Sequence, residues 1–373
     1  MKILHIIDHL GMGGAQTIIK GIFEKETNNK NIFCYSLRNN EIRVEVDHPN
    51  IYSHAGFSKF NITSLFELRN LVNEHNIDIL HCHLQKSMFF GYLLKLFFFK
   101  NIILIFHEHG SIFQNRWWYR QFIKTTRGKV DLYIAISKAT EKQLIENAGI
   151  EKDEIKVLLN FVDLDYFSSQ KTKRLEERRK LGLNDDYFIL GFAGRHIERK
   201  GCQDLILALG ELKHFENIKL LITGNGPEKE ENIKLANKLG LERNIFFLGY
   251  IPDIRWLYSI IDCFAIPSHW EPFGIVALEA HATGVPIISS NVEGLNEVVL
   301  DGKTGFLFEP KNQKDLAKKI ELLYHNEDLR REIIENGLKS AGNYSLEKYL
   351  MTLESIYCSL KDRCTNRNDA VIK

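Results

Sequence analysis

The sequence has almost no net charge, because 49 lysine and arginine residues balance 48 aspartate and glutamate residues and leave a formal charge of +1. Proteins that bind nucleic acid usually carry a basic excess, so this balance predicts no nucleic acid among the partners. One local excess stands out, because residues 84–130 hold eight basic residues and a single acid, Glu108. This stretch, 84–130, is where peripheral contact with a membrane is expected.

Cysteine is also scarce, and its six positions show none of the spacings that metal sites use. Cys82, Cys202 and Cys263 lie in or beside apolar segments. We expect them to be reduced thiols in the core, as is usual in a reducing compartment.

Long apolar runs are missing. The most apolar stretch, 88–106, is interrupted by Lys95, Lys100 and Asn101, so it fits a buried helix followed by a strand better than a membrane span. The segment MKILHII at the amino terminus is too short for the apolar region of a signal sequence and runs into Asp8. These features predict a cytoplasmic protein.

Short apolar segments of strand type alternate with longer segments of helical spacing. This alternation predicts parallel sheets with helices on both faces, the α/β class. A polar stretch, 163–179, reads as a linker and an exposed helix, so we expect one architecture used twice, in residues 1–165 and 166–345, with a ligand cleft between the two domains. A helix of about 346–373 is expected to pack back on the first domain. The expected strands are 2–7, 32–37, 78–82, 102–107, 132–136 and 155–159, then 188–193, 218–223, 244–248, 263–266, 286–290 and 305–308.

The segment SHWEPFGIVALEA, residues 268–280, carries the most informative pattern. Pro272 stands where a helix is expected to begin, because its missing N–H costs nothing in a first turn. Glu271 then precedes the helix, and Glu279 lies roughly 12 Å further along the axis. Two carboxylates that act on one bond lie about 5–10 Å apart. The longer separation fits two carboxylates that bind hydroxyls at opposite ends of an elongated ligand.

Between the two glutamates, the backbone N–H groups of Phe273, Gly274 and Ile275 are expected at the helix start, where they form an anion site. A nucleotide-diphosphate sugar has this layout, with sugar hydroxyls at one end, the anionic diphosphate in the middle and ribose hydroxyls at the other end. Taken alone, the pattern fits an acidic first turn and a solvent-exposed glutamate equally well.

In this setting, Glu-x7-Glu resembles the donor-binding motif of retaining glycosyltransferases of the GT-B fold, in particular glycosyltransferase family 4. The resemblance covers nearly the whole chain, and it implies two Rossmann-like α/β domains with parallel sheets that face each other across a cleft. Further blocks occur in the family's order: GMGGAQ (11–16), HCH (81–83), HEHG (107–110), ISKA (136–139), NFVD (160–163), GRHIERKG (194–201), GNGP (224–227) and DGKTGF (301–306).

By this resemblance, Glu271 contacts hydroxyls of the donor sugar and Glu279 contacts the ribose of the nucleotide. Residues 273–275 offer backbone N–H groups to the sugar and the diphosphate. Arg195 and Lys200 match the pair of cations that the family uses to neutralise the leaving diphosphate.

Arg199 is a competing cation in the same block as Arg195 and Lys200. Gly194 opens that block and Gly226 lies in GNGP, and both are expected at the nucleotide edge of the cleft.

The block GMGGAQ follows the first strand, and a glycine-rich turn there lets the backbone approach a phosphate or a sugar. Gly13 and Gly14 match the family loop best, and a plain tight turn is the alternative. The block is not the GxGxxG pattern, and Arg38 and Asn39 stand where a dinucleotide-binding fold would have an acid. NAD is therefore not expected, and no other cofactor is.

Four histidines lie at the ends of two neighbouring expected strands: His81 and His83, then His107 and His109. Adjacent parallel strands would bring them to one rim. A zinc site is conceivable there, but no convincing set of carboxylates or cysteines accompanies them and the family works without an essential metal, so none is expected. The family places a histidine before glycine against the reacting sugar, which His109 matches, with His107 as the alternative.

Residues 116–127 combine Trp117, Trp118, Tyr119 and Phe122 with four basic residues. Such a segment suits contact with the inner face of the cell membrane or with a lipid-linked acceptor, and a surface helix with its rings in the core is the alternative.

The resemblance implies a retaining, hexosyltransferase-type enzyme that moves a sugar from a nucleotide-sugar donor to a glycan or lipid-linked acceptor, in cell-surface polysaccharide biosynthesis. The alternatives are another GT-B enzyme and a non-catalytic nucleotide-sugar binder.

Overall fold

The computed structural model describes residues 1–11, 13–27, 29–39, 46–56, 62–114, 116–168 and 174–371, with 364–371 described by their backbone alone. Met12 of the glycine-rich block, Asn115 of the basic stretch, linker residues 169–173, the side chain of Cys364 and the last two residues lie outside this description. The chain divides into two compact units, which are described separately. Unit 1 is Met1–Asn160 with Leu346–Lys373, and unit 2 is Phe161–Ser345.

Unit 1 contains one sheet of seven parallel strands. They are β1 (Ile3–Ile7), β2 (Ile32–Ser36), β3 (Ile51–Ser53), β4 (Ile79–His83), β5 (Ile103–Glu108), β6 (Leu132–Ala135) and β7 (Ile155–Val157). Their order in the sheet is β3-β2-β1-β4-β5-β6-β7. The first strand in sequence lies inside the sheet, so the direction of winding reverses between β1 and β4, where ligands bind in open α/β sheets.

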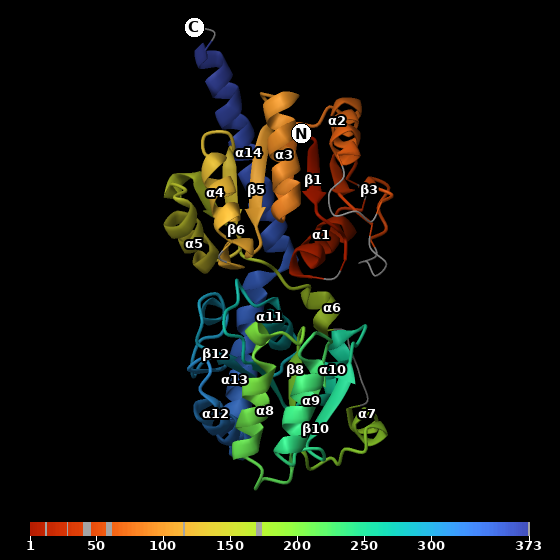
Figure 1. The fold of residues 1–373 in the computed structure, drawn as a ribbon, viewed down its shortest axis with the longest axis vertical. Helices are drawn as coiled ribbons and strands as arrows, with labels where there is room; N and C mark the ends of the chain where they lie inside the picture. The colour runs from red at the N-terminus through yellow and green to blue at the C-terminus, as the bar shows by residue number, and fades with distance from the viewer. Residues whose placement is uncertain are drawn as a thin grey trace. The chain divides into compact units, whose positions relative to one another are not determined.

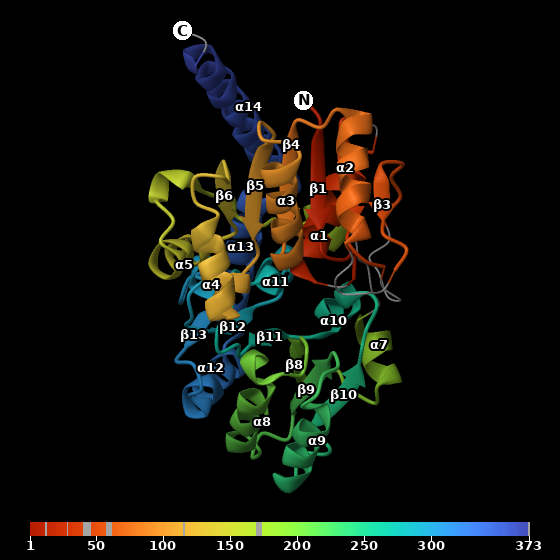
Figure 2. The ribbon, with the colours of Figure 1, turned by 45° about the horizontal axis from the view of Figure 1, so that its top comes forward.

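Successive residues of a strand point to opposite faces of the sheet, and these strands are buried at both. Helices therefore cover both faces. Leu4, Leu80 and Leu104 belong to the core under α2 (Thr63–His75), α3 (Gln85–Phe97) and α4 (Trp117–Thr125). The opposite face meets α1 (Gly14–Lys25) and α14 (Leu346–Val371), and Figures 1 and 2 show α3 and α14 on opposite sides of the strands. The remaining elements of unit 1 are α5 (Lys138–Ala148) and the 3-10 helices η1 (Ser111–Gln114) and η2 (Lys152–Glu154).

Unit 2 repeats the same topology with six parallel strands. They are β8 (Phe188–Ala193), β9 (Ile218–Thr223), β10 (Ile245–Gly249), β11 (Cys263–Ile266), β12 (Ile287–Ser290) and β13 (Phe306–Phe308). The order β10-β9-β8-β11-β12-β13 places the reversal between β8 and β11.

The helices of unit 2 also form two layers. Leu190, Leu220 and Ile288 share a core with α8 (Cys202–Glu211), α9 (Lys229–Lys238) and α12 (Gln313–His325). On the other face, the Tyr258 ring of α10 (Ile254–Ile260) packs against Phe264 of β11 at 5.2 Å between ring centroids. The other elements are α6 (Leu164–Ser168), α7 (Arg174–Lys180), η3 (Glu198–Lys200), α11 (Ile275–Ala282), η4 (Leu295–Glu297), α13 (Glu327–Ala341) and η5 (Gly342–Tyr344).

Every expected strand is present to within two residues at each end, and stretch 88–106 is a helix followed by a strand, as predicted. The structure adds β3, an edge strand too short to show a hydrophobic alternation. The helix expected within 163–179 is present as α7, but it is not wholly exposed, because its Arg178 is only 2% exposed. Cys82, Cys202 and Cys263 are buried free thiols. No helix among the described residues is long and apolar enough to span a membrane.

Candidate functional site

The carboxyl ends of β8 and β11 lie side by side where the winding of unit 2 reverses. The loop after β8 carries Arg195 and Lys200, and the loop after β11 carries Glu271. The fold thus brings Lys200 and Glu271, which are 71 residues apart, into direct contact. This end of a parallel sheet is the usual ligand-binding position.

Glu271 is held through one of its two carboxylate oxygens. Its Oε2 accepts hydrogen bonds from Nζ of Lys200 at 2.5 Å, from Arg199 at 3.5 Å and from the Ser268 hydroxyl at 3.4 Å. Among the described residues, no group donates to Oε1. Burial raises the pKa of Glu271, but Lys200 and Arg199 outweigh it, so the pKa lies below its usual value and the group is ionised at neutral pH.

The three cations of the β8 loop differ in their surroundings. Lys200 contacts Glu271 most closely, whereas the Arg199 guanidinium lies 4.3 Å from the centroid of the Trp270 ring. Arg195 is exposed, and within the described parts of the chain its side chain makes no hydrogen bond or ion pair. Arg195 is therefore the cation of this loop whose charge is available to an incoming anion.

The two glycine blocks of unit 2 pack backbone against backbone. A Cβ atom added at Gly224 would lie 2.0 Å from the carbonyl oxygen of Gly194, and one added at Gly226 would lie 2.3 Å from that of His196. Only glycine allows such an approach. Gly194 and Gly226 therefore build one continuous loop surface beside Lys200.

The helix after Glu271 begins three residues later than predicted, at Ile275 rather than at Pro272. Its N-cap, Gly274, has a φ of 92°, a left-handed conformation that interrupts regular helix. The N–H groups of Phe273, Gly274 and Ile275 donate to no described acceptor. Three free donors are thus present, although two of them belong to the preceding loop.

Glu279 differs from Glu271 in its electrostatics. Its Oε2 accepts a hydrogen bond from the Tyr258 hydroxyl at 2.9 Å, and it forms no ion pair with any residue in the described ranges. Burial raises the pKa of Glu279 to about 7, although the Tyr258 hydrogen bond opposes the shift. The protonation state of Glu279 therefore changes around neutral pH.

Sequence reasoning missed the groups that hold the Glu271 loop in place. The His269 N–H donates to the carbonyl of Arg199 at 2.8 Å, and its Nε2 lies 2.7 Å from Oδ2 of Asp204 in α8. Gln313 of α12 donates to the other Asp204 oxygen at 2.7 Å. Nothing local in the sequence marks Asp204 or Gln313, because only the fold brings them to His269.

In unit 1, Gly13 and Gly14 open α1 after β1, and the Gly13 carbonyl accepts from the N–H of Thr17 at 3.0 Å. Their contact with a ligand stays a prediction.

The predicted histidines come together, and a fifth joins them. His5 pairs with His81 in the register of β1 and β4, and His83 pairs with His107 in the register of β4 and β5. His109 follows β5. Sequence reasoning missed His5, whose only signal was its place in a central strand. His107 is fully buried, whereas His109 is partly exposed, so His109 is the one that a ligand can reach.

Two trios of these histidines offer nitrogens that lie within 4.8 Å of one another, namely His5, His81, His83 and His83, His107, His109. The rings stack, with centroids of His81 and His83 4.3 Å apart and those of His107 and His109 4.2 Å apart. Nitrogens of neighbouring rings lie at hydrogen-bonding distance, 3.0 Å between His5 and His83 and 2.9 Å between His83 and His109, so these rings form a hydrogen-bonded cluster.

Two family models match the chain: "Glycosyltransferase Family 4" over residues 31–166 and "Glycosyl transferases group 1" over residues 173–340. The uncharacterized glycosyltransferase MJ1178 of Methanocaldococcus jannaschii is 30% identical over 338 residues, 88% of each chain. The capsular polysaccharide biosynthesis glycosyltransferase CapM of Staphylococcus aureus is 29% identical over 310 residues, 80% of each. The uncharacterized glycosyltransferase MJ1607 of M. jannaschii is 30% identical over 229 residues, 60% of this chain and 59% of the relative.

Among solved structures, Anabaena Alr3699/HepE in complex with UDP superposes with a TM-score of 0.83 at 22% identity, covering 96% of this chain and 100% of that one. This likeness establishes the GT-B fold, with two Rossmann-like units. The chain belongs to the group 1 glycosyltransferases of glycosyltransferase family 4.

Proposed function

We propose that the protein is a retaining, hexosyltransferase-type enzyme that transfers a sugar from a nucleotide-diphosphate sugar to a hydroxyl of a glycan or lipid-linked acceptor. The observation that carries the proposal is the Lys200–Glu271 pair at the reversal point of unit 2, with Oε1 of Glu271 without a partner among the described residues and three N–H groups without an acceptor in the segment that follows. The kinship with CapM supports a place in cell-surface polysaccharide biosynthesis.

The donor is proposed to lie along α11. Glu271 binds hydroxyls of the sugar through Oε1, Glu279 binds the ribose, and the N–H groups of 273–275 bind the diphosphate. Arg195 and Lys200 neutralise the charge that develops on the diphosphate, and Gly194 and Gly226 let the backbone approach the nucleotide. No cofactor and no metal take part.

In the proposed reaction, the bond between the anomeric carbon and the diphosphate oxygen breaks, and the diphosphate keeps the electron pair. The acceptor hydroxyl forms the new bond on the same face, and its proton passes to the leaving diphosphate. In unit 1, Gly13 and Gly14 are proposed to bind substrate, and His109 is proposed to contact the reacting sugar. The protein acts through positioning and charge stabilisation.

The proposed donor is tested by thermal unfolding of the full chain with a panel of nucleoside diphosphates and their sugars. A ligand that binds the folded state raises the melting temperature. We expect one nucleotide series to do so, and Glu279→Ala to reduce its effect. The best donor is then offered with acceptors, and NMR of the product reports the anomeric configuration. An inverted product, or no nucleotide that stabilises the protein, would contradict the proposal.

We also infer that α4 contacts an anionic membrane surface. Trp117 and Trp118 are 75% and 45% exposed, with Arg116 and Lys124 exposed beside them, whereas Tyr119 is buried in the core. Exposed tryptophans with cations suit the interface of acidic lipids.

Co-sedimentation with vesicles of neutral phospholipid, with or without an added anionic phospholipid, tests the membrane contact. Binding is expected with the anionic vesicles and should fall in a Trp117→Ser, Trp118→Ser double variant. Phe66→Ser on α2, where Phe66 is 51% exposed, is the matched control and should bind normally. Equal binding by all three proteins argues against this contact.

A further inference from the structure

The five histidines of unit 1 form two separate rows of hydrogen bonds. In the first row, Nδ1 of His5 lies 3.0 Å from Nε2 of His83, and Nδ1 of His83 lies 2.9 Å from Nε2 of His109. In the second row, Nδ1 of His107 lies 3.1 Å from Nε2 of His81, and Nδ1 of His81 lies 2.6 Å from the Tyr357 hydroxyl of α14.

All the rings of the first row are neutral near pH 7. Burial lowers the pKa of His5 and of His109 to about 3, and burial followed by repulsion from neighbouring histidines lowers that of His83 well below its usual value. A neutral imidazole has one N–H donor and one acceptor nitrogen. Each bond in the row therefore joins a donor on one ring to an acceptor on the next.

His83 uses both of its nitrogens within the row, and this couples the protons of all three rings. If His83 donates from Nδ1, it must accept at Nε2, so His5 and His109 both carry their protons on Nδ1. If His83 donates from Nε2, His109 must donate from its own Nε2, and all three protons lie on Nε2. His5 and His109 are thus linked through His83.

The end of the row at His109 is open. No described residue forms a hydrogen bond with Nδ1 of His109. This nitrogen is also not one of the fully buried polar atoms that lack a partner, so it is accessible from outside. The tautomer of the row decides what this nitrogen offers. With the proton on Nε2, Nδ1 of His109 accepts a hydrogen bond, and with the proton on Nδ1 it donates one.

We propose that His83 and His5 are positioning residues that fix the tautomer of His109 and thereby determine which hydrogen bond it makes through Nδ1. The other end of the row, Nε2 of His5, also has no partner among the described residues and is not among the fully buried polar atoms that lack one. Neither end therefore forces a tautomer, and the intrinsic preference of neutral histidine for the proton on Nε2 leaves His109 with an acceptor nitrogen, suited to orienting a sugar hydroxyl. That the partner is a sugar rests on the proposed function. The coupling of the tautomers does not depend on it.

The test is NMR of the full chain with 15N-labelled histidine, in which the shifts of the two ring nitrogens report the tautomer. His109 is assigned by its loss in His109→Gln. We expect the Nε2-protonated form in the unaltered protein. His5→Phe leaves Nε2 of His83 without a partner, and because a buried N–H without an acceptor is rare, the row should move toward protons on Nδ1.

Two further variants keep the test decisive if His5→Phe fails to fold. His83→Phe removes the bond to His109 directly and should give a mixed tautomer there. Tyr357→Phe is the matched control, because it removes one hydrogen bond of the second row and leaves the first intact, so the His109 signal should not change. If the His109 tautomer is the same in the unaltered protein and in every folded His5 or His83 variant, the proposal is wrong.

Activity gives a second readout. If the sugar transfer holds, His5→Phe should lower kcat about tenfold, as for one lost hydrogen bond, with the KM for the donor unchanged. If the transfer fails but the His109 tautomer still changes in His5→Phe, the proposed function falls and the proton coupling stands.

Discussion

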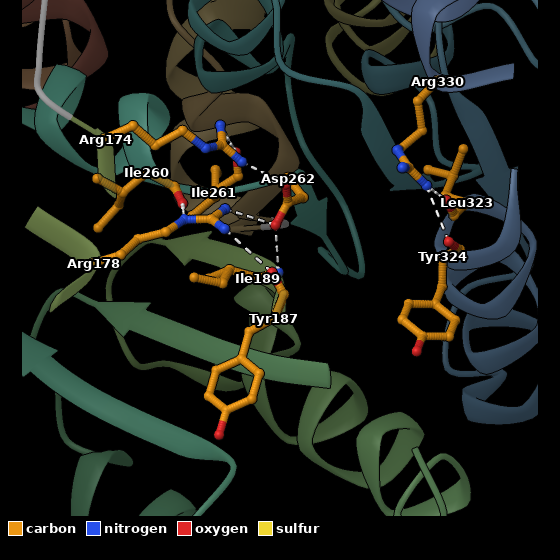
Figure 3. A network of polar contacts seen from close by, with 10 residues as sticks. All are labelled: Arg174, Arg178, Tyr187, Ile189, Ile260, Ile261, Asp262, Leu323, Tyr324 and Arg330. Carbon is orange, nitrogen blue, oxygen red and sulfur yellow. Dashed lines mark hydrogen bonds and ion pairs between the residues drawn. The ribbon is translucent and has the colours of Figure 1, made fainter. Parts of the chain in front are cut away.

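Two carboxylates flank β11, and each is paired with two cations, yet they differ in how completely they are bonded. Asp262, just before the strand, is bound through one oxygen to Arg174 and through the other to Arg178 at 2.7 Å and to the Ile189 N–H at 2.7 Å (Figure 3). Glu271, beyond the other end, uses Oε2 alone.

The cations repeat this difference. Arg178 also donates to the carbonyls of Ile260 at 2.8 Å and Tyr187 at 3.2 Å, so its donors are directed into the protein (Figure 3). The Lys200 ammonium has only Glu271 as a partner among the described residues. A buried charge network is tolerable when it is fully bonded, so the Asp262 network holds α7 to the sheet. An incompletely bonded carboxylate, followed in the chain by N–H groups without a described acceptor, is suited to a ligand.

The largest expected effect on stability comes from breaking the complete network. Arg178→Ala removes a buried guanidinium and one partner of the partly exposed Asp262, which keeps Arg174, so it should lower the free energy of unfolding by about 1.5–3 kcal/mol. Chemical denaturation measures this. Arg179→Ala is the control, because its pair with Asp185 is exposed, and it should change stability by less than about 1 kcal/mol. Equal effects would remove the distinction between the two kinds of ion pair.

Weakening the Lys200–Glu271 pair, which leaves Oε1 of Glu271 without a partner, should lower turnover rather than stability. Glu271→Gln keeps a side chain that can accept from Lys200 but weakens the proposed contact with the donor sugar, so kcat should fall about 10²–10³-fold while the melting temperature changes little. Steady-state kinetics and calorimetry on one preparation check both. Glu198→Gln, an exposed acid of the neighbouring loop, should be neutral. A large loss of stability in Glu271→Gln would mean that Glu271, like Asp262, mainly stabilises the fold.

Arg195 sharpens the contrast with Arg178, since one arginine is exposed and the other buried. Arg195→Ala should lower turnover roughly 10²-fold, through lost stabilisation of the leaving diphosphate, and should not change the denaturation midpoint. Arg243→Ala, an exposed arginine of the same unit, serves as control. Unchanged kinetics in Arg195→Ala would mean that Lys200 and Arg199, rather than Arg195, stabilise the leaving diphosphate.

The smallest effect concerns Glu279, which has no cation partner in the described chain. Its pKa of about 7 means that it loses its charge as the pH falls through neutrality. Because the ionised form accepts ribose hydroxyls best, the Kd for the nucleotide sugar should weaken about tenfold from pH 8 to pH 6. Calorimetric titration at both values tests this, and Glu279→Gln should abolish the pH dependence. If the Kd of Glu279→Gln changes with pH as much as that of the unaltered protein, Glu279 is not the group responsible.

The strands and the family blocks could be predicted because their signals are local. Alternating apolar segments located every expected strand, and the spacing of Glu271 and Glu279 was visible in one short segment. The start of α11 could not be located in the same way. Pro272 signals a helix start, but the left-handed backbone at Gly274 postpones it to Ile275.

The bonding state of each side chain was decided by the tertiary structure. Arg178 looks like any charged residue of a polar stretch, and it becomes buried because Asp262, 84 residues away, lies against it. The sequence marks His5 only by its place in a central strand, and its bond to His83 spans 78 residues. Order along the chain determined which residues lie near each strand end. Only the packed fold decided which of their polar atoms are bonded and which remain open, because hydrogen-bond partners and burial come from distant segments.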